Sequence, residues 1–342
     1  IQKNFCSALM LLFPTKKKRG GGKYWMNSLT KQIYGKVHIL SMNKLLIICG
    51  PTATGKTAVA VALAKKFNGE LVSADSRQVY RGMDIGTGKD SGSLQGVPIW
   101  MYDEVNPDEL FSVSQYQKKA KTYIEDIRKR NKLPIIVGGT GLYIQSLIQT
   151  VPTSHIKPNS TLREKLEKET LHSLQCIMKE ECLHVWGLLN DSDRNNPHRL
   201  IRKIEIAKAG VTKLNKPKEK DYDICWIGLT SSFTSLYNRI DKRVERRVKQ
   251  GMVEEVKKLL KSGYTWDLPS MSALGYRELK DYIEGSATME DMIQKWKYDE
   301  HGYARRQMTW FKRNNDIHWF DISKDGFEKN IESLVQSWYT QK

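Results

Sequence analysis

Residues 50–57 constrain this chain more than any other part of its sequence. They read Gly-Pro-Thr-Ala-Thr-Gly-Lys-Thr and match the pattern G-x-x-x-x-G-K-[ST]. The apolar run 45–49 precedes them, and residues 58–67 follow with helical periodicity, which predicts a strand, a loop and a helix. In that setting the loop backbone cradles a phosphate, Lys56 supplies positive charge and the Thr57 hydroxyl can ligate Mg²⁺.

Three further apolar runs predict a parallel sheet. Residues 70–74, 133–137 and 224–229 are short and bounded by turn residues, and residues 114–130 have the pattern of an amphipathic helix. Buried strands that alternate with helices predict an α/β, P-loop NTPase-like fold with a doubly wound parallel sheet. Ligands bind such sheets at the carboxyl ends of the strands.

The chain divides into four parts on these patterns. Residues 1–41 contain no acidic residue and are expected to be unstructured or an upstream extension of the true start. We expect residues 42–151 to form the first part of the core, 152–192 a helical insertion, and 193–342 the second part of the core with basic C-terminal helices. We expect residues 234–260 and 289–312 to be helical.

Compartment and partners follow from composition. No apolar run approaches the roughly 18 residues of a membrane span, so we expect no contact with a membrane interior. The five cysteines are odd in number and scattered, which favours a reducing compartment. We expect a cytoplasmic monomer, or an organellar protein if residues 1–41 are a targeting segment.

The positive charge predicts a phosphate-rich partner. Lys and Arg number 56 against 38 Asp and Glu, a net charge of +18, and +10 remains without the eight basic residues of 1–41. Such an excess over the body of a protein is typical of nucleic-acid binding.

Asp75 is the candidate acid. It follows the predicted strand 70–74, whereas the strand 133–137 ends without an acid, in Gly138-Gly139-Thr140. A carboxylate at a strand end beside a phosphate cradle can ligate a metal or act as general base. The alternative is an ordinary turn or helix-capping Asp.

A series of motifs then resembles the tRNA dimethylallyltransferases, also called tRNA isopentenyltransferases. The matching segments, in order, are 50–57, 75–80, 82–87, 138–143, 196–202, 239–247, 275–278 and 304–310. Together they span roughly residues 42–321. One departure stands in the last motif, which usually begins Thr-Arg, because Glu300-His301 occupies that place; this predicts a weakened basic contact.

The resemblance implies transfer of a dimethylallyl group from its diphosphate to the N6 amine of the adenosine 3′ to the anticodon. Asp75 would be the general base, and Lys56, Thr57 and Arg243 would serve the departing diphosphate, with Mg²⁺ on Thr57. Diphosphate binding would involve Gly50, Pro51, Thr52, Ala53, Thr54, Gly55, Lys56, Thr57, Arg239 and Arg243.

The same resemblance implies contacts to the tRNA anticodon stem-loop. The residues implied are Asp75, Ser76, Arg77, Gln78, Thr140, Arg163, His198, Arg199, Leu200, Ile201 and Arg202. Taken alone, Arg163 and Arg199 would be solvated surface charges.

Three alternatives share part of this pattern. An adenylate isopentenyltransferase would use a free nucleotide as acceptor, and a nucleotide or small-molecule kinase would use the same phosphate cradle for ATP. A non-enzymatic RNA-binding protein would leave Lys56, Thr57 and Asp75 unexplained.

Overall fold

The computed structural model describes residues 43–89, 91–149, 153, 156, 159–210 and 222–341. The expectations for residues 1–41 lie outside these ranges. Within them, no helix is both long enough and apolar enough to cross a bilayer.

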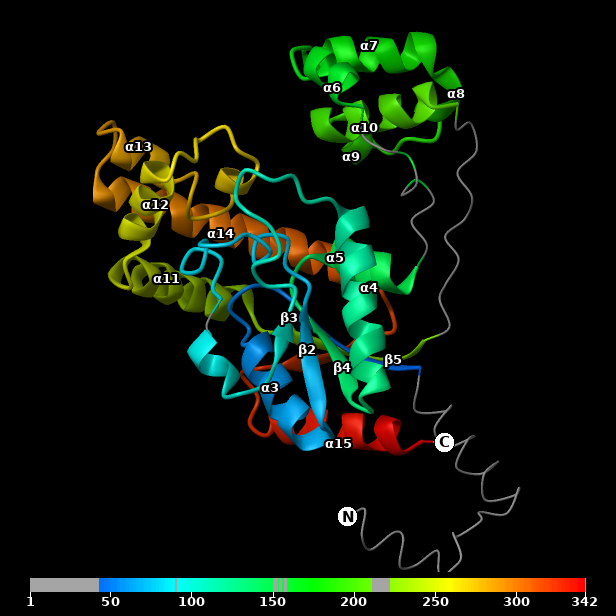
Figure 1. Cartoon of the computed structure of the whole chain (residues 1–342), viewed down its shortest axis with the longest axis vertical. Helices are drawn as coiled ribbons and strands as arrows, with labels where there is room; N and C mark the ends of the chain where they lie inside the picture. The colour runs from blue at the N-terminus through cyan, green and yellow to red at the C-terminus, as the bar shows by residue number, and fades with distance from the viewer. Residues whose placement is uncertain are drawn as a thin grey trace, which may run out of the picture. The chain divides into compact units, whose positions relative to one another are not determined.

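A six-stranded, all-parallel sheet organises the core (Figure 1). Its order is β3-β2-β4-β1-β5-β6. In chain order the strands are β1 (Lys44–Cys49), β2 (Gly69–Ser73), β3 (Ile99–Trp100), β4 (Leu133–Val137), β5 (Asp223–Thr230) and β6 (His318–Asp321). Leu46 of β1 pairs with Ile135 of β4 on one side and with Cys225 of β5 on the other, so β1 lies at the centre.

Both faces of the sheet are covered, as the continuous apolar strands require. Alternate residues of β1 point to opposite faces, so Ile47 joins one hydrophobic cluster and Ile48 the other. The Ile48 cluster includes side chains of α3 (Lys56–Phe67) and α15 (Phe327–Thr340). The Ile47 cluster includes α4 (Val113–Lys129), α5 (Gly141–Ile148), α11 (Phe233–Lys249), α12 (Met252–Lys261), α13 (Leu279–Ile283) and α14 (Met289–Phe311).

The predicted α/β class and the four predicted strands are confirmed. The two short strands β3 and β6 were not predicted, because two to four half-buried residues leave little periodicity to detect. The helical stretch expected over residues 234–260 is two helices, since Gly251 adopts a left-handed φ of 98° that ends α11 and precedes α12.

A helical unit follows the first part of the core. Its helices are α6 (Ser160–Leu166), α7 (Leu171–Glu181), α8 (Leu183–Trp186), α9 (Asp191–Arg194) and α10 (Pro197–Lys208). Leu174 and Met178 of α7 pack with Leu200 and Ile204 of α10 in a hydrophobic cluster of their own. Helix α10, which lies beyond the expected boundary at residue 192, thus completes the core of this unit.

Candidate functional site

The loops that follow β1, β2 and β4 meet at the carboxyl edge of the sheet. The backbone N–H of Thr140 donates to the carbonyl of Ala74 at 3.0 Å, and the N–H of Ser76 donates to Thr140 Oγ1 at 3.1 Å. Asp75 lies between these two bonds in sequence, so the β4–α5 turn holds the segment that carries it. The structure therefore places Thr140 beside the segment that carries Asp75.

The loop of residues 50–57, here called the phosphate loop after its sequence pattern, is shaped by its glycines and by the hydroxyl group of Thr54. A Cβ on Gly50 would collide with the carbonyl oxygen of Leu229 on β5, so only glycine lets the loop leave the sheet at this point. Thr54 Oγ1 donates to the carbonyl of Pro51 at 2.9 Å, and Gly55 has a φ of 83° directly before α3. Thr57 is the second residue of that helix.

Lys56 lies under the same loop. Its ammonium group donates to the carbonyl of Pro51 at 2.8 Å. Loss of solvent, followed by the positive charge of Arg243, lowers the pKa of Lys56 to about 8, while the negative charge of Asp75 opposes the change. A negatively charged ligand beside Lys56 would stabilise its ammonium form, which burial disfavours.

Two arginines of α11 contact the phosphate loop. Arg239 Nε donates to the carbonyl of Ala53 at 2.7 Å, and Arg243 donates to the hydroxyl of Thr52. They are four residues apart and therefore share one face of the helix. The structure places both beside the loop, where the resemblance implied a diphosphate.

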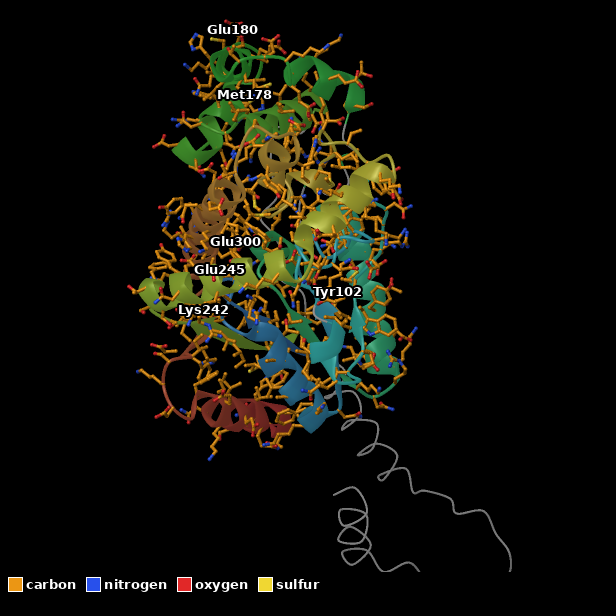
Figure 2. All side chains as sticks on the ribbon, turned by 90° about the vertical axis from the view of Figure 1, so that its left-hand side faces the viewer. Tyr102, Met178, Glu180, Lys242, Glu245 and Glu300 are labelled. Atoms are coloured by element: carbon orange, nitrogen blue, oxygen red, sulfur yellow. The ribbon has the colours of Figure 1, made fainter. Side chains whose placement is uncertain are left out.

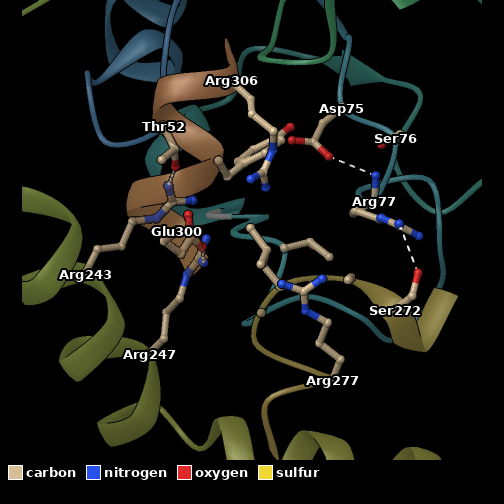
Figure 3. Close-up of a pocket in the computed structure, with 15 residues that line it drawn as sticks. Thr52, Asp75, Ser76, Arg77, Arg243, Arg247, Ser272, Arg277, Glu300 and Arg306 are labelled. Atoms are coloured by element: carbon tan, nitrogen blue, oxygen red, sulfur yellow. Dashed lines mark hydrogen bonds and ion pairs between the residues drawn. The ribbon is translucent and has the colours of Figure 1, made fainter. Parts of the chain in front are cut away.

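A cavity of about 290 Å³ opens between the loop and Asp75 (Figure 3). Five arginines and two carboxylates are among its lining residues, so its charge favours an anion. The residues are Thr52, Asp75, Ser76, Arg77, Gly86, Thr87, Arg243, Arg247, Ser272, Ala273, Leu274, Arg277, Glu300, Tyr303 and Arg306.

The turn that follows Asp75 holds its carboxylate in place. Its Oδ1 accepts the backbone N–H of Arg77 at 2.8 Å, and the Arg77 guanidinium donates to the carbonyl of Pro269 at 2.7 Å. Gln78 does not line the cavity. Its side-chain amide donates to the carbonyls of Thr87 and Gly88 at 3.2 Å and so stabilises the segment that contains these two residues.

Gln307 of α14 joins two of the loops. Its side-chain oxygen accepts the backbone N–H of Thr52 at 2.8 Å, and its amide nitrogen donates to the carbonyl of Gly139 at 3.0 Å. A Cβ on Gly139 would overlap that nitrogen, which explains the glycine. Gln307 is buried, so both bonds form away from water.

Sequence reasoning assigned no role to several residues that line the cavity, among them Arg247, Arg277, Glu300, Tyr303 and Arg306. Arg306 lies in the quoted segment 304–310 and Arg277 in 275–278, so the motif pattern was the signal that could have found them. Loss of solvent, followed by the negative charge of Asp75, raises the pKa of Tyr303, which remains a neutral phenol at ordinary pH.

His301 does not line the cavity. Its Nε2 lies 2.8 Å from Asp241 Oδ1, and its ring stacks on Tyr237 with centroids 4.1 Å apart. Position 301 therefore faces α11 outside the cavity, and the weakened basic contact expected there stays a prediction.

The remaining expected tRNA contacts lie in the helical unit. Arg163 binds both oxygens of buried Glu205, at 2.7 and 2.8 Å, and Arg202 donates to the same carboxylate at 3.1 Å. Arg199 and His198 are exposed on α10. The side chains of Leu200 and Ile201, in contrast, are buried in the core of the unit and cannot contact RNA while it is folded.

Metal ligands are few in the described part of the chain. It contains no group of three or more His, Cys, Asp or Glu side chains able to hold a metal ion. Mg²⁺ in phosphate sites keeps several waters and takes oxygens from the phosphate groups, so it needs few protein ligands, and a hydroxyl at the start of α3 would be one of them. The position of Thr57 fits that requirement.

Comparison with known proteins identifies relatives that match most of the chain. The curated tRNA dimethylallyltransferase of Roseiflexus sp. (strain RS-1) is 39% identical over 302 residues, covering 87% of this chain and 99% of the relative. That of Alkaliphilus oremlandii (strain OhILAs) is 40% identical, with 86% and 97% covered.

Solved structures are similar over the same length. The full-length tRNA isopentenylpyrophosphate transferase from Bacillus halodurans has a TM-score of 0.66 at 37% identity and covers 87% of this chain and 97% of its own. A eukaryotic dimethylallyltransferase acting on tRNA, at 24% identity, shares the fold with a TM-score of 0.71 over 86% of this chain and 78% of its own. The family model for IPP transferase matches residues 78–314, and this chain belongs to that family.

Proposed function

We propose that this protein transfers a dimethylallyl group from dimethylallyl diphosphate to N6 of the adenosine 3′-adjacent to the anticodon in tRNA and releases diphosphate. One observation carries the proposal: the same cavity is lined by Thr52 of the phosphate loop, by Arg243 bonded to it, and by the Asp75 carboxylate after the next strand. A reaction that expels diphosphate and takes a proton from an amine needs both.

The phosphate loop acts as a P-loop NTPase-like cradle in this proposal. Residues 50–57 turn their backbone toward the diphosphate at the N-terminus of α3, where the helix dipole favours negative charge. Lys56 and Arg243 both contact the loop, and their positive charges offset the negative charge that develops on the leaving oxygen of the diphosphate. Mg²⁺ held by the Thr57 hydroxyl would supply further neutralisation of the diphosphate.

Asp75 acts as the general base. The exocyclic amine of adenine is a weak nucleophile, and it loses a proton as the new C–N bond forms. The Asp75 carboxylate lines the cavity and its turn holds it in place through the Arg77 N–H, so it can accept that proton.

The acceptor is tRNA in this proposal, bound by a cytoplasmic monomer. The net charge of +18 supports an RNA partner, and exposed His198 and Arg199 lie on α10 of the helical unit. The free thiols of Cys49, Cys176, Cys182 and Cys225 fit a reducing compartment.

The test is a transfer assay with a matched acceptor series. The protein is incubated with dimethylallyl diphosphate and either tRNA, AMP or no acceptor, and in parallel with ATP in place of the diphosphate. Nucleoside mass spectrometry of digested tRNA should show the added dimethylallyl group on the adenosine beside the anticodon. Prenylation of AMP instead would favour a free-nucleotide acceptor, and phosphate transfer from ATP would favour a kinase.

A further inference from the structure

Arg247 of α11 and Glu300 of α14 form an ion pair within the cavity. Arg247 Nη1 lies 3.4 Å from Glu300 Oε1, and the two side chains are only 5% and 7% exposed. Both line the cavity, beside Thr52 and Arg243 (Figure 3). Lys242 and Glu245 are exposed on the other side of α11 (Figure 2), so Arg247 lies on the inward face of this helix.

The guanidinium groups of Arg243 and Arg247 are neighbours. A Cβ built on Gly88 would collide with both of them, so the two groups converge over the same glycine. Like charges this close repel each other in a site withdrawn from water. Glu300 offsets this repulsion while the cavity holds no anion, and its negative charge also acts on Lys56.

The pair is not in its strongest geometry. Tight arginine–carboxylate pairs form two parallel bonds at about 2.7–2.9 Å. Arg163 and Glu205 in the helical unit show that geometry, with 2.7 and 2.8 Å, whereas Arg247 and Glu300 are 3.4 Å apart. A diphosphate, with several negative charges, can therefore compete with Glu300 for the Arg247 donors.

We infer that Arg247 is a further diphosphate-binding residue and that Glu300 is its counter-ion when no diphosphate is bound. This inference rests on the proposed function, because it takes the diphosphate of the donor as the anion. It adds a third arginine of α11 to Arg239 and Arg243, which already lie beside the phosphate loop. Glu300 opposes the anion, so the pair sets how tightly the leaving pyrophosphate is held.

Inorganic pyrophosphate is the probe, titrated calorimetrically into the full chain with and without Mg²⁺. Arg247→Met keeps the bulk of the side chain and should raise the Kd about 10- to 100-fold, the worth of a charge-assisted hydrogen bond. Glu300→Gln keeps an acceptor for Arg247 and removes the opposing charge, so its Kd should equal or fall below that of the wild type.

The double variant Arg247→Met/Glu300→Gln guards against misfolding, because it leaves no unpaired charge in the interior. It should bind pyrophosphate more weakly than the wild type, though no more weakly than Arg247→Met, with its folding checked by thermal unfolding. Asp241→Asn with His301→Ala is the matched control, since it removes a polar pair between the same two helices outside the cavity. The control should keep the wild-type Kd.

Two results would overturn the inference: a wild-type Kd in the folded double variant, or weaker binding in Glu300→Gln. Failure of the proposed function looks different. In that case the wild type itself does not bind pyrophosphate, or Lys56→Ala binds it as well as the wild type does.

Discussion

Asp75 gives the sharpest prediction for a single residue. Asp75→Asn keeps the shape of the side chain and its bond from the Arg77 N–H, but the amide cannot accept the proton of the reacting amine. We expect kcat to fall about 10²- to 10⁴-fold, with tRNA affinity nearly unchanged. Asp108→Asn, at an exposed position, is the control. A kcat within a factor of a few of the wild type would remove Asp75 from the role of base.

Lys56 gives a pH dependence. Its pKa near 8 lies below the ordinary 10.5, so the ammonium group is nearly fully charged below about pH 7, half charged near pH 8 and neutral well above it. Pyrophosphate affinity should fall between about pH 8 and 10 to the extent that Lys56 contributes. Calorimetric titration of the wild type and of Lys56→Met over this pH range checks this. The difference between their pH profiles of pyrophosphate affinity is the contribution of Lys56. Parallel profiles would contradict it.

At the scale of elements, α14 supports the site through Gln307. Gln307→Leu removes the partners of the Thr52 N–H and the Gly139 carbonyl, and each buried unpaired group costs about 1–3 kcal/mol. We expect a clear loss of Tm and a higher KM for the diphosphate, because the phosphate loop loses its tie to the β4–α5 turn. Gln294→Leu, exposed on the same helix, should change neither. Equal effects of the two substitutions would show that the tie is unimportant.

The helical unit depends on Glu205. Burial opposes ionisation of this carboxyl, but the hydrogen bonds from Arg163, Asn159 and Arg202 outweigh it and lower the pKa below 4.5. The stabilisation is therefore present above about pH 4.5 and is lost as the pH falls through the lowered pKa. Glu205→Gln should destabilise the unit at pH 7 by about 1–3 kcal/mol.

Thermal unfolding between pH 3 and 7 checks this, since Glu205→Gln should flatten the acid part of the profile. Glu181→Gln breaks an exposed pair with Lys208 and is the control. A profile unchanged from the wild type would mean that the Arg163 pair contributes little.

For the whole molecule, the positive charge should appear in the salt dependence of tRNA binding. The logarithm of affinity falls linearly with the logarithm of salt concentration, in proportion to the phosphates contacted. Arg199→Gln should weaken binding and reduce that slope by about one. Lys329→Gln on α15 removes the same charge elsewhere and should leave the slope unchanged. A steep slope that neither substitution alters would place the phosphate contacts on other residues.

The phosphate loop and the position of Asp75 were predictable from sequence, because both are local. The spacing of Gly50, Gly55 and Lys56 determines the turn and the start of α3, and the end of an apolar strand determines where Asp75 emerges. Neighbouring parallel strands then bring their carboxyl ends to one edge of the sheet.

Only the tertiary structure decided the rest of the cavity. Thr52 and Gln307 are 255 residues apart, and Arg247 and Glu300 are 53 apart on different helices. Whether such residues meet depends on how α11 and α14 pack against the sheet, which no local pattern encodes. The same reason explains α10. Only its packing on α7 shows that Leu200 and Ile201 face a core while Arg199 faces solvent.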